Sequence, residues 1–400
     1  MRKQAFLFFV LCTSAYAQCV DPIYKDQMEL WNASGVKDGI PTDHSVYSMI
    51  TPVLGSTIHS SVNGDTTLQA ELKAATLVGG RQKVVLHNGI YPIDHFDIPS
   101  NVLLMGENID STIIKSTFRN SRTSIDEAGI VEIQDGTVFA GIENLTIDYT
   151  VLDCHISDYE GKDLHTPNTY QSSYYTNTPC DRTDLEVTGI EIRPNASNCW
   201  VRNVKINNIG STPMKISGDN NTVDNCYFKG AYMKGTNGQG YFEINGDGNR
   251  IIGNTFHFLR HVVLQKYNGA VKPNGNVLFN NLLYGCDYNI HDDEDGDNLF
   301  EQNEVRQASW SAWGPYHTGH ACCHQVPDIS NWLVNNKMYN KQNISEFSDT
   351  DVVYKSTGKF KGRGEEGLED SGKKMSACGY FFTDETPRSQ MGFVQPLMDR

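Results

Sequence analysis

Polar residues suited to acid–base chemistry recur along the middle of the chain at intervals of 22 to 28 residues. Each stands between or beside apolar residues, and together they are Glu191, Lys215, Glu243, Gln265 and His291. Strand side chains alternate between two faces, so the apolar neighbours should face a core and these five should face outward. If each interval is one turn of a coil, the five form a row with a spacing of about 4.8 Å.

Such a row suits eliminative cleavage of a uronic acid polymer. This reaction needs a base for the C5 proton, a cation or amide facing the adjacent carboxylate, and an acid for the departing oxygen. Two flanking carboxylates favour the protonated form of Lys215, which makes it a poor base. We therefore expect Arg260, His261 and His291 to lead the catalysis, with Lys215 and Glu243 beside them.

Other residues are candidates for holding the substrate. We expect Glu191 and Gln265 to do so from the row, and Tyr241 from the end of the glycine-rich stretch 235–240. Trp310 and Trp313 could stack on sugar rings, or could simply cover the side of the coil. A solvated ladder of ion pairs is the alternative interpretation of the charged row.

A hydrolase is the second enzymatic interpretation. Glu191 and Glu243 would lie two turns apart, with backbones about 9.6 Å from each other. This is near the upper end of the spacing for an inverting pair of carboxylates.

The densest cluster of charge follows His291. Asp292, Asp293 and Asp295 offer the oxygen ligands that Ca²⁺ prefers, so we expect a calcium site here. An EF-hand is disfavoured, because Asn298 stands where that loop needs glycine. An exposed acidic turn is the alternative, and no other cofactor is expected.

Asparagine pairs five residues apart indicate how these residues are positioned. The pairs are Asn198/Asn203, Asn220/Asn225, Asn249/Asn254, Asn276/Asn281, Asn298/Asn303 and Asn331/Asn336. A period of 20 to 50 residues indicates a solenoid, and the short apolar runs beside each pair favour strands over helices. A buried amide at one recurring corner can bond to the same side chain one turn above and below.

The stretches Asn88–Tyr91 and Leu103–Glu107, together with these turns, resemble the pectin-lyase-like right-handed parallel β-helix superfamily over residues 68–340. Leu259–Val263 and Asn298–Asn303 are similar to segments of exported β-helix proteins. The resemblance implies an exported protein that acts on polysaccharides as a lyase, hydrolase or epimerase. We expect an all-β parallel β-helix solenoid with a short helix over 68–76 capping its N-terminal end.

The sequence divides the chain into a signal segment, a main domain and a C-terminal tail. Residues 1–17 have the basic start, apolar run and small-residue cleavage pattern of a secretory signal. We place the β-helix domain over 18–345 and a C-terminal tail or strap over 346–400. Export to an oxidising compartment favours disulfide bonds, and Cys154 and Cys180 are a candidate pair.

The net negative charge of the chain limits the classes of partner that it can bind. The chain carries 48 acidic and 33 basic residues, a formal charge of -15. This disfavours nonspecific binding to nucleic acid or an anionic membrane surface. Together with the row of polar residues, the resemblance implies a secreted lyase acting on an acidic polysaccharide, and we expect it to be a monomer. A glycoside hydrolase or uronate C5-epimerase is the first alternative, and a noncatalytic glycan-binding adhesin is the second.

Overall fold

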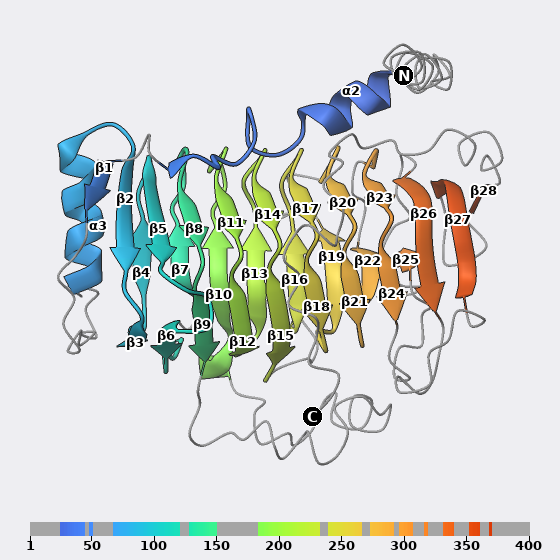
Figure 1. Ribbon diagram of the computed structural model, residues 1–400. Coiled ribbons are helices and arrows are strands. Elements are labelled where there is room, and N and C mark those ends of the chain that lie inside the picture. Colours follow the sequence, from blue (N-terminus) through green and yellow to red (C-terminus); the bar gives the residue numbers. More distant parts are fainter. Residues whose placement is uncertain are drawn as a thin grey trace, which may run out of the picture.

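The computed structural model describes residues 25–44, 48–50, 67–120, 128–149, 183–232, 239–265, 273–291, 296–306, 316–318, 331–339, 352–360 and 368–369. These residues form a coil of short strands, in which each turn stacks on the one before (Figure 1). Pairing between successive turns is parallel throughout the coil. The expected right-handed parallel β-helix is confirmed.

The coil has three sides. The first side is an 8-stranded parallel sheet of β4 (Phe96–Ile98), β7 (Ala128–Ile133), β10 (Val187–Ile192), β13 (Thr212–Ile216), β16 (Tyr241–Ile244), β19 (His261–Gln265), β22 (Asp287–His291) and β25 (Tyr316–Thr318). The second side contains β1 (Ser48–Ile50), β2 (Gln82–Leu86), β5 (Val102–Gly106), β8 (Gly141–Glu143), β11 (Trp200–Arg202), β14 (Thr222–Asp224), β17 (Arg250–Ile252), β20 (Val277–Phe279) and β23 (Leu299–Glu301).

The third side contains β3 (Gly89–Pro92), β6 (Thr112–Ser116), β9 (Thr146–Tyr149), β12 (Lys205–Ile209), β15 (Tyr227–Ala231), β18 (Thr255–His257), β21 (Leu282–Tyr284) and β24 (Glu304–Arg306). The long strand β26 (Asn331–Tyr339) pairs with both β23 and β24, and so joins the second and third sides. Antiparallel β27 (Val352–Phe360) and β28 (Leu368–Glu369) follow it. A 3₁₀ turn, η3 (Thr183–Leu185), precedes β10.

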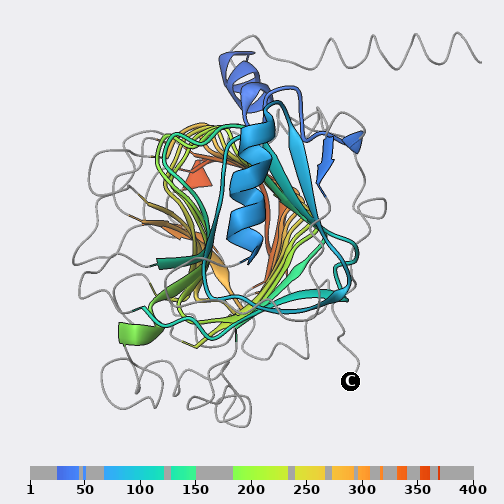
Figure 2. The same cartoon turned by 90° about the vertical axis from the view of Figure 1, so that its left-hand side faces the viewer.

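Helix α3 (Thr67–Val78) closes the N-terminal end of the coil, where Figure 2 shows it lying across the opening. It buries Leu68, Leu72 and Ala75 in the main core cluster. These residues fall on one face of a helix because they are spaced by three and four positions. The predicted capping helix is confirmed. It covers the apolar interior of the first turn, which solvent would otherwise reach.

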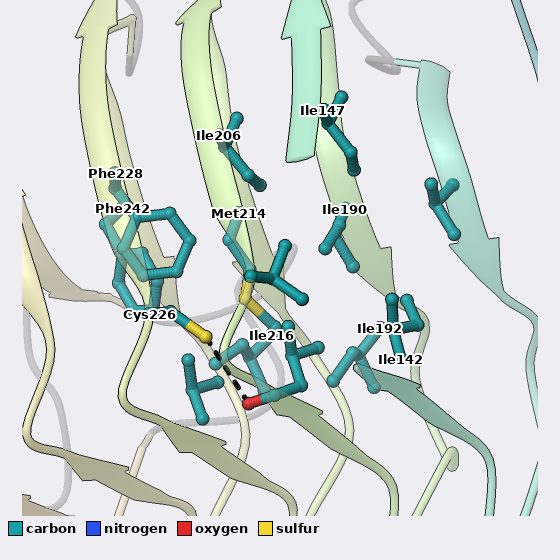
Figure 3. Close-up of a cluster of buried hydrophobic side chains, with 14 of the residues drawn as sticks. Ile142, Ile147, Ile190, Ile192, Ile206, Met214, Ile216, Cys226, Phe228 and Phe242 are labelled. Carbon is teal, nitrogen blue, oxygen red and sulfur yellow. Dashed lines mark hydrogen bonds between the residues drawn. The ribbon is translucent and has the colours of Figure 1, made fainter. Parts of the chain in front are cut away.

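Apolar side chains from all three sides fill the coil (Figure 3). On the first side, Ile190, Met214 and Phe242 align one above another and point inward. The Cys226 thiol lies among them and donates to the Val201 carbonyl oxygen at 3.5 Å. Alternation then sends the residues between these inward positions to the outer surface.

Two ladders of buried asparagines run along the ends of the second-side strands. One consists of Asn221, Asn249, Asn276, Asn298 and Asn331, and the other of Asn254, Asn281, Asn303 and Asn336. In the second ladder, Asn281 Nδ2 donates to Asn303 Oδ1 at 3.0 Å, and Asn303 Nδ2 donates to Asn336 Oδ1 at 3.0 Å. Each Oδ1 also accepts a backbone N–H from the preceding turn, so the predicted stacking of amides is confirmed.

Two of the six predicted asparagine pairs do not belong to these ladders. Asn198, Asn203, Asn220 and Asn225 adopt left-handed φ angles of 51° to 55°, one residue before each ladder position. In later turns Gly248 and Gly253 occupy the same left-handed corners. Asparagine tolerates this conformation almost as well as glycine does, so one spacing covers two structural roles.

The N-terminal segment lies along the outside of the second side. In the last turn of helix α2 (Lys25–Ala33), Trp31 Nε1 donates to the carbonyl oxygen of Asp297, just before β23, at 2.7 Å. The chain then crosses β17, β14 and β11 toward the capped end (Figure 1). We call residues 31–44 the N-terminal strap, which the sequence analysis did not predict.

Three cysteines lie in the described part of the chain. Cys199, Cys226 and Cys286 are buried free thiols. Burial raises the pKa of Cys199 to about 12, so it stays protonated. The other cysteines, including Cys154 and Cys180, lie outside the described residues. Residues 1–17 also lie outside them, and the domain boundary at 345 stays a prediction.

Among the described helices, none combines the length and apolar character that a membrane crossing needs.

Candidate functional site

The outer face of the first side brings together most of the residues expected to do chemistry. Strand register places Glu191 opposite Lys215, and Lys215 opposite Glu243. The row extends toward the capped end through Glu132 and Asp97. The predicted order of a cation between two carboxylates is therefore present.

The other two members of the predicted row are misplaced by two residues. Glu243 pairs with Val263, and Val263 pairs with Asn289. Gln265 and His291 do face each other in register, but they lie two positions further along their strands. The prediction that they continue the Glu191–Lys215–Glu243 row is wrong.

The pair His261 and Asp287 stands at the opposite end of the same strands. His261 Nδ1 and Asp287 Oδ1 form a short hydrogen bond, and both side chains are buried. Because Asp287 accepts from Nδ1, the N–H of the neutral imidazole lies there and Nε2 carries the basic lone pair. A buried carboxylate in this place also stabilises the imidazolium that forms when Nε2 takes the proton.

Tyr241 and Arg260 surround this histidine. The Tyr241 ring lies 5.1 Å from the His261 ring, measured between centroids. The Arg260 guanidinium carbon lies 5.0 Å from the centre of the Tyr241 ring on β16. The cation is buried with the histidine, in surroundings where its charge acts more strongly than in water.

The row of charges is not a solvated ladder. Glu191 and Glu243 expose only 2% and 4% of their surface. Arg193 Nη1 lies 3.0 Å from Glu191 Oε1, and Lys215 Nζ lies 3.7 Å from Glu243 Oε2. Buried carboxylates need such partners, because taking an isolated charge out of water is costly.

Glu132 shares Arg193 with Glu191. Its Oε1 lies 3.1 Å from Arg193 Nη2 and accepts the Gly129 backbone N–H at 3.0 Å. Burial disfavours its charged form, but Arg193 and the Gly129 N–H together hold the pKa of Glu132 below its ordinary value. Glu132 therefore stays ionised at neutral pH.

Asn289 contributes an acceptor to the same face. It lies two residues after Asp287 on β22 and is only 6% exposed. Its Oδ1 is buried without a hydrogen-bond donor in the structure. A buried oxygen left in this state costs about 1–3 kcal/mol, so it is suited to a donor that arrives with a ligand.

Several predicted residues fall where the structure gives no side-chain description. Trp310, Trp313, Asp292, Asp293 and Asp295 lie outside the described residues, so the calcium site stays a prediction. His291 ends β22 opposite Gln265, and its backbone alone is described.

Sequence reasoning missed Asp287, Arg193 and Asn289. A signal for Asp287 was present, because it follows His261 by 26 residues, the same interval that separates Gln265 from His291. Arg193 could have been found two residues after Glu191, on the same face of an extended chain.

Comparisons with known proteins complete the description. No protein-family model matches the chain, and a search of curated proteins finds no match. Among solved structures, an exopolygalacturonase from Thermotoga maritima is 9% identical, covering 78% of this chain and 84% of that one, with a TM-score of 0.48. A polygalacturonase from Erwinia carotovora is 14% identical, covering 78% and 85%, with a TM-score of 0.44.

The A-module of a mannuronan C-5 epimerase from Azotobacter vinelandii is 17% identical, with a TM-score of 0.34. That match covers 60% of this chain and 51% of the module, so the chain spans about half of its length. The coil has the parallel β-helix architecture that the sequence resemblance implies. At these identities and TM-scores, the likeness does not determine a reaction, which must be argued from the side chains.

Proposed function

We propose that the chain cleaves a uronate-containing polysaccharide by β-elimination, with His261 as the group that transfers the proton. The observation that carries the proposal is the buried His261–Asp287 pair on the outer face of the first side. Histidine is the side chain best suited to exchange a proton near neutral pH, and Asp287 fixes its orientation and tautomer.

In this proposal one histidine serves both proton transfers. His261 Nε2 takes the C5 proton, and the electron pair of the C5–H bond forms the C4=C5 double bond. The C4–O bond breaks, and the departing oxygen accepts a proton from the imidazolium. Arg260 supplies the positive charge that the uronate carboxylate needs while negative charge develops beside it.

A hydrolase is less well supported by the same face. Inverting hydrolysis needs one protonated carboxyl group and one ionised carboxylate. Glu191 is paired with Arg193, and Glu243 with Lys215. Both pairs favour the ionised carboxylate, which is the wrong state for a general acid.

The test is an assay of unsaturated product over a panel of alginate, pectate and sulfated glycans. We expect ultraviolet-absorbing ends from at least one polymer, and a loss of about 10²–10⁴-fold in kcat for His261→Ala. Asp287→Asn should lose part of the rate, because the imidazolium is no longer stabilised. His257→Ala is the matched control, since His257 ends β18 on the third side.

Other outcomes identify the alternatives. Reducing ends without absorbance would indicate a hydrolase. Deuterium incorporation at C5 without cleavage would indicate an epimerase, and binding with no reaction an adhesin. Full activity in His261→Ala would refute the assigned role of this histidine.

A further inference from the structure

A second cluster of polar residues lies at the capped end of the first side, apart from His261. His95 precedes β4, Asp97 lies within β4, and Glu132 lies in register with Asp97 on β7. One ligand atom from each residue lies within 4.8 Å of the other two. We propose that His95, Asp97 and Glu132 bind a divalent transition-metal ion such as Zn²⁺ or Mn²⁺.

The orientation of His95 supports the proposal. Its Nδ1 lies 2.7 Å from the Gly129 carbonyl oxygen, a contact that only an N–H can make. The lone pair of the neutral ring is therefore on Nε2, which lies 3.6 Å from Asp97 Oδ1. A cation between these two atoms, either a proton or a metal ion, would satisfy both. Histidines that bind metals usually donate their other N–H to a carbonyl or carboxylate in this way.

Protein donors hold the two carboxylates of the cluster in place. Glu132 Oε1 is occupied by Arg193 and the Gly129 N–H. The Gln134 side-chain amide donates to Glu132 Oε2 at 2.9 Å and to Asp97 Oδ1 at 2.6 Å. Its NH₂ group thus stands between the two carboxylates, where positive charge is favoured. Turning this amide over would present its oxygen as a fourth ligand.

The donor set selects the kind of metal. Ca²⁺ prefers six to eight oxygen ligands, whereas one imidazole nitrogen with carboxylate oxygens suits Zn²⁺ or Mn²⁺. Tetrahedral zinc needs ligand atoms roughly 3.3 Å apart, so the cluster must contract. His95 and Asp97 can move because their side chains are 31% and 38% exposed. That exposure also gives the ion a route from solvent.

A second histidine–carboxylate pair provides the control. His87 Nδ1 lies 2.7 Å from Glu107 Oε1, at a more exposed position on the same end of the coil. Among the described residues, no third His, Cys, Asp or Glu ligand atom groups with this pair. His87→Ala therefore removes a histidine bonded to a carboxylate without touching the proposed site.

The experiment is equilibrium dialysis of the full chain, made without a histidine tag and stripped with chelator, against Zn²⁺, Mn²⁺ or Ca²⁺. We expect wild type to bind one equivalent of Zn²⁺ or Mn²⁺ more than His95→Ala, and to show a rise in Tm that this variant lacks. Asp97→Asn, which keeps the side-chain shape, should bind at least about 10-fold more weakly. His87→Ala should match wild type.

Equal stoichiometry and affinity in wild type and His95→Ala would overturn the proposal. The proposal would also be overturned if only Ca²⁺ bound, and if it bound equally to wild type and His95→Ala, because the His95 nitrogen would then not be a ligand. Circular dichroism tests whether each variant is folded. If His95→Ala is not, Asp97→Asn decides the question alone.

Discussion

His261 and Asn289 show how the outer face of the first side differs from an ordinary surface. An outward strand position normally carries a polar group that water satisfies. Here the imidazole is bonded to a buried carboxylate, and the amide oxygen two residues after that carboxylate has no donor. The unpaired oxygen costs stability, which is characteristic of groups kept for binding or catalysis.

Replacing Asn289 with leucine should separate stability from function. The change removes a buried acceptor that has no donor, so the free energy of unfolding should stay level or rise by about 1 kcal/mol. Under the proposed function, KM should rise several-fold, because a sugar hydroxyl loses its acceptor. Denaturant unfolding and steady-state kinetics measure the two effects, with Asn207→Leu on the third side as control. A loss of stability above 1 kcal/mol would show that the oxygen has a structural partner.

Asp148 on the third side offers a test of electrostatics away from the candidate site. Burial raises the pKa of Asp148, and the nearby Lys115 offsets this only in part. A carboxyl group whose pKa is raised on folding destabilises the protein above that pKa, and has no such effect below the pKa of the unfolded chain.

Asp148→Asn should therefore raise the free energy of unfolding at pH 7 by a few tenths of a kcal/mol. The gain should disappear near pH 3, where the carboxyl is protonated in both states. Urea unfolding at the two pH values measures it, and Asp38→Asn at an exposed position is the control. An equal gain at both pH values would exclude the electrostatic cause.

At the scale of elements, the asparagine ladders hold the turns in register. The Asn281 amide accepts from the turn before and donates to the turn after, so this one side chain ties three turns together. Glycine or asparagine at the adjacent left-handed corner then directs the chain onto the next side.

Asn281→Leu should be strongly destabilising. The change removes the acceptor for the Asn254 backbone N–H, which is left buried and unpaired, and it removes the side-chain donor to the Ile251 carbonyl oxygen and to Asn303 Oδ1. We expect a loss of about 3 kcal/mol in the free energy of unfolding, measured with denaturant. Asn207→Leu, outside the ladders, should change it by less than about 0.5 kcal/mol. Similar losses in the free energy of unfolding at the two positions would show that the ladder does not stabilise the coil.

The repeat could be predicted from sequence, but the register of the first side only in part. Glu191, Lys215 and Glu243 stand alone between apolar neighbours, so alternation placed them correctly. In β19 the run Val262–Val263–Leu264 is apolar on both faces, and alternation there gives no register. Only the hydrogen-bonded pairing shows that Val263, and not Gln265, follows Glu243.

At the scale of the whole molecule, the N-terminal strap connects turns that are far apart in sequence. Gly35 N–H donates to the Gly248 carbonyl oxygen at 2.6 Å, and Val36 N–H donates to Thr222 Oγ1 at 2.9 Å. Val36 also packs with Leu103 and Trp200 in a small apolar cluster outside the coil. No repeat or charge pattern in residues 31–44 indicates these contacts, so the strap could not be predicted from the sequence.

Two glycines of the strap form a matched pair for testing it. Both Gly35 and Gly39 have left-handed φ angles, of 78° and 80°. A Cβ at Gly35 would lie 2.5 Å from Arg250 Cδ and 2.7 Å from Thr222 Oγ1, whereas a Cβ at Gly39 meets nothing within 4 Å. Gly35→Ala should therefore detach the strap, and Gly39→Ala should only strain it.

We expect limited proteolysis to cut Gly35→Ala within the strap at least several-fold faster than Gly39→Ala, while the coil stays intact. Hydrogen exchange should show the same contrast at Val36. Equal rates in the two variants would mean that the close packing at Gly35 does not hold the strap.

The strap also has a consequence for how the chain is made. Trp31 leaves the ribosome long before Asp297, which lies 266 residues later and supplies its hydrogen-bond acceptor. Stacking can proceed turn by turn from the capped end, since each winding needs only its predecessor. The strap is therefore synthesised before the coil but docks after it, and its docking completes the folded structure.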